Sequence, residues 1–151
     1  CTAVDSLAAE AYYRIGKVYL NQNDYVAAYS NFNKALQRKN NYSQAYFCRG
    51  LTRAHLGVNE YAVADFDTAI TLSPGDADIY YYRGTTFIAM GQIKKAIEDF
   101  SKAIDLKPGF KEAFYERANA KQTIYDIKGA SEDWEKAGKI LSDSLGSILD
   151  K

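Results

Sequence analysis

The stretch ADIYYYRGTTFIAMGQIKKAIEDFSKAIDLKP, residues 77–108, decides the fold of this chain, because its pattern occurs four times. The copies lie 34 residues apart, so Gly84 of this stretch aligns with Gly16, Gly50 and Ala118. A fixed period of this length is typical of an array of stacked helical repeats. The other aligned columns are Ala28, Ala62, Ala96 and Ala130, then Phe32, Phe66, Phe100 and Trp134, then Ala35, Ala69, Ala103 and Ala137.

Each copy predicts two helices joined by a short turn. In the third copy, Tyr80, Gly84 and Phe87 recur at helical spacing, and Asp76 stands before them as an N-cap. Gly91 ends the first helix, because glycine readily takes the left-handed conformation that follows a helix. The full set of predicted helices is about 5–22, 25–38, 43–56, 60–72, 77–90, 93–106, 111–124 and 128–145.

A pair of short helices cannot bury its own apolar face, so neighbouring pairs must stack on one another. We therefore expect one domain over residues 1–151, with repeats at about 9–42, 43–76, 77–110 and 111–144. Residues 142–151 are expected to cap the last repeat, as a continuation of its second helix or as a short extra helix. Within each repeat, we expect the glycine and the first alanine, such as Gly84 and Ala96, to let the two helix backbones approach closely.

Composition and charge exclude several classes of function. The chain has 19 Lys and Arg against 19 Asp and Glu, so it lacks the positive charge that a nucleic-acid binder needs. No apolar run is long enough to cross a bilayer, so membrane contact would require a segment outside this sequence. Cys1 and Cys48 are too few for a disulfide framework or a zinc site. Mature bacterial lipoproteins also begin with cysteine, an alternative that the sequence leaves open.

The usual signatures of an active site are missing as well. There is no glycine-rich phosphate loop, no paired histidine or cysteine motif and no nucleophile elbow, and His55 is the single histidine. We therefore expect no enzyme activity, no cofactor and no metal. The composition is that of a soluble domain, and the sequence leaves two locations open: the cytoplasm, or attachment to a membrane by an anchor outside this sequence.

The repeated pattern resembles that of the tetratricopeptide repeat family, over about residues 9–144, and most of all its bacterial members. The resemblance implies an all-α fold, a right-handed α-solenoid of four helix-turn-helix repeats with a C-terminal capping segment. It also implies that the first helix of each pair lines a concave groove, which binds peptides or partner proteins. The matching residues of the third copy are Tyr80, Arg83, Gly84, Phe87, Gly91, Ala96, Phe100, Ala103 and Pro108.

Two columns of opposite charge change together between the copies. The arginines of one column are replaced by Ile15 in the first copy, and the aspartates of the other column are replaced by Asn31. This covariation predicts ion pairs within a repeat or with the adjacent one, which fix geometry more than they add stability. The expected pairs are Arg49–Asp65, Arg83–Asp99 and Arg117–Asp133.

Helical geometry selects the residues of the groove. Tyr12, Ile15, Gly16 and Tyr19 are expected to face the packing partner, whereas Tyr13 turns toward the groove. The column of Tyr13 is aromatic in every copy, and tyrosine is well suited to binding. The alternative is that these rings pack against the next repeat, and both can hold in part. The predicted groove residues are Glu10, Tyr13, Lys17, Asn21, Gln44, Phe47, Leu51, His55, Asp78, Tyr81, Tyr82, Thr85, Glu112, Tyr115 and Asn119.

These observations favour a non-enzymatic scaffold that binds a peptide or protein segment, as an assembly or adaptor factor. Rings and acids together suit an amphipathic or basic partner segment. The alternatives are a self-association module that forms a homo-oligomer, or the soluble part of a membrane-anchored assembly protein. A co-chaperone that holds acidic chaperone tails is disfavoured, because only Lys17 supplies a cation at the family's clamp positions.

Overall fold

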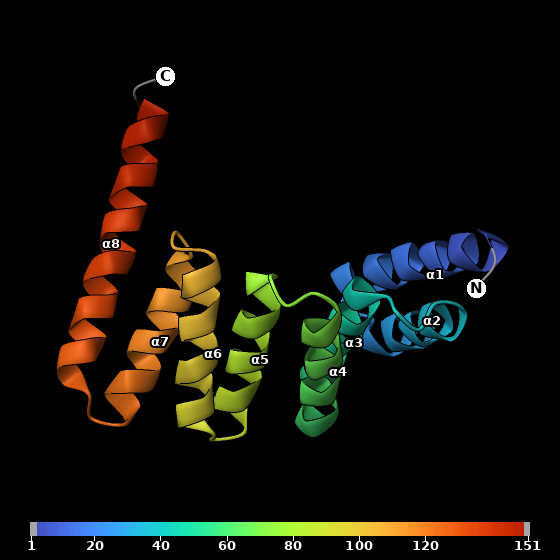
Figure 1. The fold of residues 1–151 in the computed structure, drawn as a ribbon, viewed down its shortest axis with the longest axis horizontal. Helices are drawn as coiled ribbons and strands as arrows, with labels where there is room; N and C mark the ends of the chain where they lie inside the picture. Colours follow the sequence, from blue (N-terminus) through green and yellow to red (C-terminus); the bar gives the residue numbers. More distant parts are fainter. Residues whose placement is uncertain (1–2, 150–151) are drawn as a thin grey trace. The chain divides into compact units, whose positions relative to one another are not determined.

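The computed structural model describes the backbone of residues 3–149 and the side chains of residues 3–142. Over residues 3–149 the chain forms eight α-helices and no strand (Figure 1). The helices are α1 (Ala3–Asn21), α2 (Tyr25–Arg38), α3 (Ser43–His55), α4 (Asn59–Leu72), α5 (Ala77–Ala89), α6 (Ile93–Leu106), α7 (Lys111–Thr123) and α8 (Ile127–Leu149). The all-α helical-repeat solenoid expected from the sequence is therefore confirmed. The segment after Ser142 continues α8 as far as Leu149, so the continuation alternative holds.

The chain divides into two compact units, one ending at Gly75 and the other beginning at Asp76. In the first unit, the α1–α2 hairpin stacks on the α3–α4 hairpin through contact between α2 and α3. In the second unit, the α5–α6 hairpin stacks on the α7–α8 hairpin in the same way, through α6 and α7. The first helices of stacked hairpins also touch, α1 with α3 and α5 with α7.

In the first three repeats, the glycine of the first helix faces a phenylalanine ring. A Cβ atom on Gly50 would lie 2.7 Å from Cε1 of Phe66, and Gly16 and Gly84 stand in the same relation to their own phenylalanines. The space left by the missing glycine side chain is therefore filled by the ring. That the glycine and the first alanine of a repeat let the two helix backbones approach closely stays a prediction. The fourth repeat has Trp134 in the aromatic column, and this larger ring is only partly buried.

Local signals set the helix ends as expected. The Asp76 side chain accepts a hydrogen bond of 3.1 Å from the backbone N–H of Asp78, and Gly91 has a positive φ of 70°. Gly57 and Tyr125 occupy the same position of their repeats, with φ of 76° and 64°. Tyr125 therefore holds a left-handed conformation that a non-glycine residue adopts only at a cost.

One expected packing contact on α1 is missing. Gly16 is buried as expected, but the Ile15 side chain is 44% exposed. The prediction that Ile15 faces a packing partner is wrong for the described part of the chain. Within the two units, the first helices α3 and α7 are instead in contact with α2 and α6 of the hairpin before them.

None of the described helices is both long enough and apolar enough to cross a bilayer.

Candidate functional site

All three expected arginine–aspartate pairs are present, and each is made by two parallel hydrogen bonds. Nε of Arg49 donates to Oδ2 of Asp65 over 2.9 Å, and Nη2 donates to Oδ1 over 2.6 Å. In the second unit the corresponding distances are 2.8 and 2.6 Å for both Arg83–Asp99 and Arg117–Asp133. All three aspartates are buried.

The third nitrogen of the arginine fork reaches the hairpin before it. Nη1 of Arg49 donates to Oδ1 of Asn33 over 2.6 Å, and Nη1 of Arg117 donates to Oγ of Ser101 over 2.9 Å. Each of these forks therefore joins its own repeat to the preceding one. Their hydrogen-bonding groups are used within the fold, so they serve as structural clamps between hairpins.

The arginines also rest on aromatic rings that the sequence analysis did not connect with them. The guanidinium carbons lie 5.3 Å from the ring centre of Tyr46, 5.7 Å from that of Tyr80 and 5.5 Å from that of Phe114. These rings occupy one column, one residue before the predicted groove rings. The first copy keeps a ring in this column, Tyr12, although Ile15 replaces the arginine. The rings therefore do not covary with the arginines as the aspartates do.

The groove residues of the first unit lie on α1 and α3, and we call them the N-terminal wall. They are Glu10, Tyr13, Lys17 and Asn21 on α1, and Gln44, Phe47, Leu51 and His55 on α3. The structure brings the two helices together here, since Sγ of Cys48 on α3 lies 4.0 Å from the Tyr13 hydroxyl. The Tyr13 ring packs between Phe32 and Tyr42, with ring centres 6.1 and 5.0 Å away. Burial raises the pKa of Tyr13 well above its usual value.

The single carboxylate of the N-terminal wall is already engaged. Glu10 accepts a short hydrogen bond from the Tyr42 hydroxyl and another of 2.6 Å from Nε of Arg14. The bond from Tyr42, assisted by Arg14, lowers the pKa of Glu10. At the other end of the wall, the His55 ring stacks on Tyr25 at 4.7 Å between ring centres. The rest of the wall, Asn21 and Gln44 included, is mainly polar and exposed.

The groove residues of the second unit form the C-terminal wall: Asp78, Tyr81, Tyr82 and Thr85 on α5, and Glu112, Tyr115 and Asn119 on α7. Tyr81 is half-buried, with ring centres of Phe110 and Tyr82 at 4.9 and 5.1 Å. Burial, with added repulsion from Glu116, Tyr82 and Glu112, raises the pKa of Tyr81 to about 12. The negative charge of α7 therefore opposes ionisation of the Tyr81 hydroxyl.

Two rings of the C-terminal wall are partly exposed, although Tyr82 also contacts the Tyr81 ring. Tyr82 is 39% exposed and Tyr115 is 49% exposed. The acids beside them are only loosely paired, Asp78 with Lys107 at 3.8 Å and Glu112 with Lys111 at 3.7 Å. The rings of the two walls thus differ: Tyr13, Phe47 and Tyr81 pack in part inside their units, whereas Tyr115 and the neighbouring Tyr82 are more exposed. That the fifteen residues form one binding groove stays a prediction.

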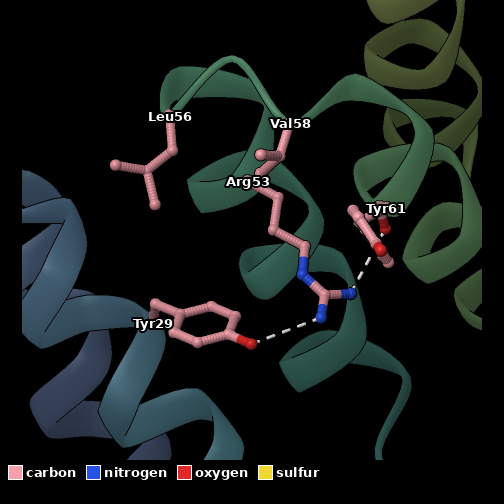
Figure 2. Close-up of a pocket in the computed structure, with 5 residues that line it drawn as sticks. All are labelled: Tyr29, Arg53, Leu56, Val58 and Tyr61. Atoms are coloured by element: carbon pink, nitrogen blue, oxygen red, sulfur yellow. Dashed lines mark hydrogen bonds between the residues drawn. The ribbon is translucent and has the colours of Figure 1, made fainter.

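A pocket that the sequence analysis missed lies in the first unit (Figure 2). Tyr29, Arg53, Leu56, Val58 and Tyr61 line this cavity of about 310 Å³. The guanidinium of Arg53 lies between the two tyrosine rings, 5.4 and 5.5 Å from their centres. It also donates to Oδ2 of Asp65 over 2.7 Å. Asp65 therefore pairs with the charge of Arg53, and the exposed Leu56 and Val58 give the pocket an apolar part. Only proximity in space brings these residues together, since they occupy different columns of the repeat.

Among the residues that the structure describes, no group of three histidine, cysteine, aspartate or glutamate side chains is arranged to hold a metal ion. Cys48 is buried, and this burial raises the pKa of its thiol to about 11. At neutral pH the thiol is therefore protonated and a poor nucleophile.

Comparisons with known proteins agree with the geometry. The tetratricopeptide repeat family matches at residues 9–42 and again at residues 77–110. A crystal structure of MamA superposes with a TM-score of 0.88, at 25% identity, over 91% of this chain and 81% of MamA. No curated protein sequence matches this chain.

Two further solved structures share the fold. YrrB, described as a tetratricopeptide repeat protein with an unusual peptide-binding site, gives a TM-score of 0.79 at 24% identity, over 95% of this chain and 74% of YrrB. The first such domain of Spaghetti (RPAP3), bound to an HSP90 peptide, gives 0.77 at 22% identity, over 80% of this chain and 95% of that domain.

Proposed function

Because this chain carries tetratricopeptide repeats, we propose that it is a non-enzymatic scaffold that binds a peptide or protein segment along the first helices of its repeats. Peptide binding by YrrB and by the RPAP3 domain is compatible with this role, although their likeness to this chain concerns the fold. An adaptor or assembly factor is the finer role that we infer. The observation that carries the proposal is the pair of partly exposed rings in the C-terminal wall, Tyr82 and Tyr115, beside loosely paired acids.

The rings and acids specify the chemistry of the segment. Tyrosine faces bind apolar and cationic side chains and lose little rotational freedom in doing so. Asp78 and Glu112 are exposed and can exchange their weak surface partners for a lysine or arginine of the ligand. We therefore infer a basic amphipathic segment, with apolar side chains on Tyr82 and Tyr115 and cations toward the acids.

The same acids argue against a role in holding acidic chaperone tails. A carboxylate-rich tail would meet Asp78 and Glu112 on the C-terminal wall, where like charges repel. On the N-terminal wall, Lys17 is the one cation, and its Nζ lies 5.7 Å from the Tyr13 ring centre. A single lysine cannot supply the several charge-assisted hydrogen bonds that a tail carboxylate requires.

A peptide array tests the proposal because it samples many candidate ligands at once. The purified chain is applied to immobilised peptides of varied charge and amphipathicity, and binders are remeasured by fluorescence anisotropy. We expect basic amphipathic peptides to be enriched. The double variant Tyr82→Ala and Tyr115→Ala should bind them at least about tenfold more weakly, as expected when an interface loses central tyrosines.

The matched control is Tyr125→Ala, which removes an 89% exposed tyrosine from the turn before α8, away from the wall. This variant should bind like the wild type. Undiminished binding by the folded double variant, or an array without preference for basic peptides, would contradict the proposal.

A further inference from the structure

The pocket of the first unit, which we call the Arg53 pocket, combines apolar walls with one charged group. Leu56 and Val58 come from the turn between α3 and α4, and they are 43% and 41% exposed. Figure 2 shows them above the cavity and Tyr29 of α2 below it, with the Arg53 guanidinium between Tyr29 and Tyr61. The cavity of about 310 Å³ has the size of a small-molecule site, at the lower end of the usual range.

The charges around the Arg53 pocket do not balance. The Asp65 carboxylate pairs with both Arg49 and Arg53, at 2.6 and 2.7 Å, and the described residues place no second carboxylate within ion-pair distance of either arginine. These three groups therefore carry one net positive charge. Its effect reaches the pocket, because hydrogen bonds from Asn33 and Arg53, together with the charges of both arginines, lower the pKa of the Tyr29 hydroxyl.

Hydrogen-bond donors remain for a ligand in the Arg53 pocket. Nη1 of Arg53 donates to Asp65 over 2.7 Å and to the carbonyl oxygen of Tyr61 over 3.3 Å, and Nη2 donates to the Tyr29 hydroxyl over 3.4 Å. Nε of Arg53 has no acceptor among the residues that the structure describes. The Tyr29 oxygen acts as an acceptor in its present bonds, so its hydroxyl hydrogen is left to donate. A ligand carboxylate can accept from both groups.

The second unit has the same cation without the rings. Lys121 takes the place of Arg53, with Nζ 2.9 Å from the corresponding aspartate and 3.5 Å from the carbonyl oxygen of Gly129. Where the first unit has its two tyrosines, this unit has Ile97 and Gly129. The pairing of a cation with the aspartate is therefore common to both units, whereas the rings belong to the first. Burial does not explain the Tyr61 ring, which is 64% exposed.

We propose that the Arg53 pocket binds a small aromatic carboxylate. The carboxylate accepts hydrogen bonds from Nε of Arg53 and from the Tyr29 hydroxyl, and the ligand ring packs on Leu56, Val58 and the tyrosine rings. A neutral apolar ligand would leave the unbalanced positive charge without an anion. A phosphate, with its higher charge and three acceptor oxygens, would find too few donors.

The proposal does not rest on peptide binding by the scaffold. The Arg53 pocket shares no residue with the N-terminal wall or the C-terminal wall, since it is lined from α2, α4 and the end of α3. The peptide of the proposed function and the acid proposed here therefore require different side chains, and the two proposals can fail separately.

Titration of the isotope-labelled chain with phenylacetate, followed by proton–nitrogen correlation spectra, measures the binding and locates it. We expect saturable shifts of the Nε–H signal of Arg53 and of the backbone signals of Leu56 and Val58, with a dissociation constant in the millimolar range. Phenylacetamide lacks the charge and acetate lacks the ring, so each should bind at least about tenfold more weakly.

Two variants separate the rings from the cation. Tyr29→Ile with Tyr61→Ala removes both rings but keeps Arg53 on Asp65, and it should weaken phenylacetate binding at least about tenfold. Arg53→Lys keeps a cation for Asp65, as in the second unit, but has no Nε–H, and it should weaken binding to a similar extent.

The matched control is Tyr125→Ala, which removes an exposed tyrosine from the second unit and should leave phenylacetate binding unchanged. Circular dichroism of each variant establishes that it is folded. A wild type without saturable shifts, equal binding of phenylacetate and phenylacetamide, or undiminished binding by either folded variant of the pocket would overturn the proposal.

Discussion

Arg117 donates two parallel hydrogen bonds of 2.8 and 2.6 Å to Asp133, and Lys121 forms an ion pair of 2.9 Å with the same carboxylate. Burial by itself raises the pKa of Asp133, but the hydrogen bonds from Arg117 and Lys121 outweigh it, so the pKa lies below the ordinary 3.8. The aspartate is therefore held in its charged form inside the last hairpin. The Arg49 and Asp65 pair, with Arg53 in the place of Lys121, repeats this arrangement in the first unit.

The lowered pKa of Asp133 predicts a pH-dependent part of the stability. The unfolded chain binds a proton at this carboxyl at higher pH than the folded chain does, so the contribution is complete above pH 3.8 and is lost as the pH falls below it. Asp133→Asn should lower the free energy of unfolding by about 3 kcal/mol at pH 7, since it leaves the buried cations without their carboxylate. Urea denaturation at pH 7 and pH 3 should show this difference shrinking at the lower pH. A difference of equal size at both pH values would count against the account.

In the first repeat, Ile15 and Asn31 replace both members of an arginine–aspartate pair. This joint change predicts that the arginine and the aspartate of each pair are energetically coupled. Asp65→Asn alone should cost about 3 kcal/mol, because Arg49 keeps its charge in a half-buried position. Adding Arg49→Ile, which reproduces the first repeat, should recover part of that loss and give a coupling energy of about 1 kcal/mol or more in a double-mutant cycle. Additive losses measured by chemical denaturation would show that the two columns vary independently.

The glycine–phenylalanine contact predicts opposite effects for two glycine-to-alanine changes. Gly50→Ala places a methyl group 2.7 Å from the Phe66 ring, and we expect a loss of about 1 kcal/mol or more even after the gain in helix propensity. Gly138→Ala is the matched control, because nothing lies within 4 Å of the added Cβ. It should stabilise the chain by about 1 kcal/mol through helix propensity alone. Thermal unfolding of both variants decides the matter, and a stabilising Gly50→Ala would refute the steric argument.

The left-handed conformation of Tyr125 predicts that glycine is the better residue there. Tyr125→Gly removes strain at a φ of 64°, and the ring it deletes is almost fully exposed, so we expect a gain of about 1 kcal/mol. Gly91→Ala makes the reverse change at a φ of 70° in open space and should lose about 1 kcal/mol. If both changes shifted the melting temperature in the same direction, the conformational explanation would fail.

The period of the sequence predicted much of this fold. The columns of Gly84 and Phe100 located the hairpins, and Gly91 and Asp76 located helix ends, because these depend on local chemistry that recurs in each copy. The arginine–aspartate pairs were also predictable, since the first copy changes both partners together. The contact of each glycine with a ring was not foreseen, because spacing along the chain does not show which side chain fills a gap.

The site was predicted less completely, for a physical reason. Which groove rings stay exposed depends on the last residue of the repeat: Tyr42 and Phe110 cover Tyr13 and Tyr81, and neither belongs to the repeated core columns. The bond from Tyr42 to Glu10 likewise joins two positions that the repeat pattern does not relate. Contacts between unlike columns, including the pocket around Arg53, become visible only when the hairpins are stacked in space.

Charge reversal on the C-terminal wall shows whether its acids select the bound peptide. Fluorescence anisotropy compares a basic with an acidic amphipathic peptide of the same apolar face, on the wild type and on Asp78→Lys with Glu112→Lys. Both altered side chains are exposed, so the variant should fold like the wild type. We expect the wild type to prefer the basic peptide and the variant to prefer the acidic one. An unchanged preference in the folded variant would contradict the assignment of this wall as the binding surface.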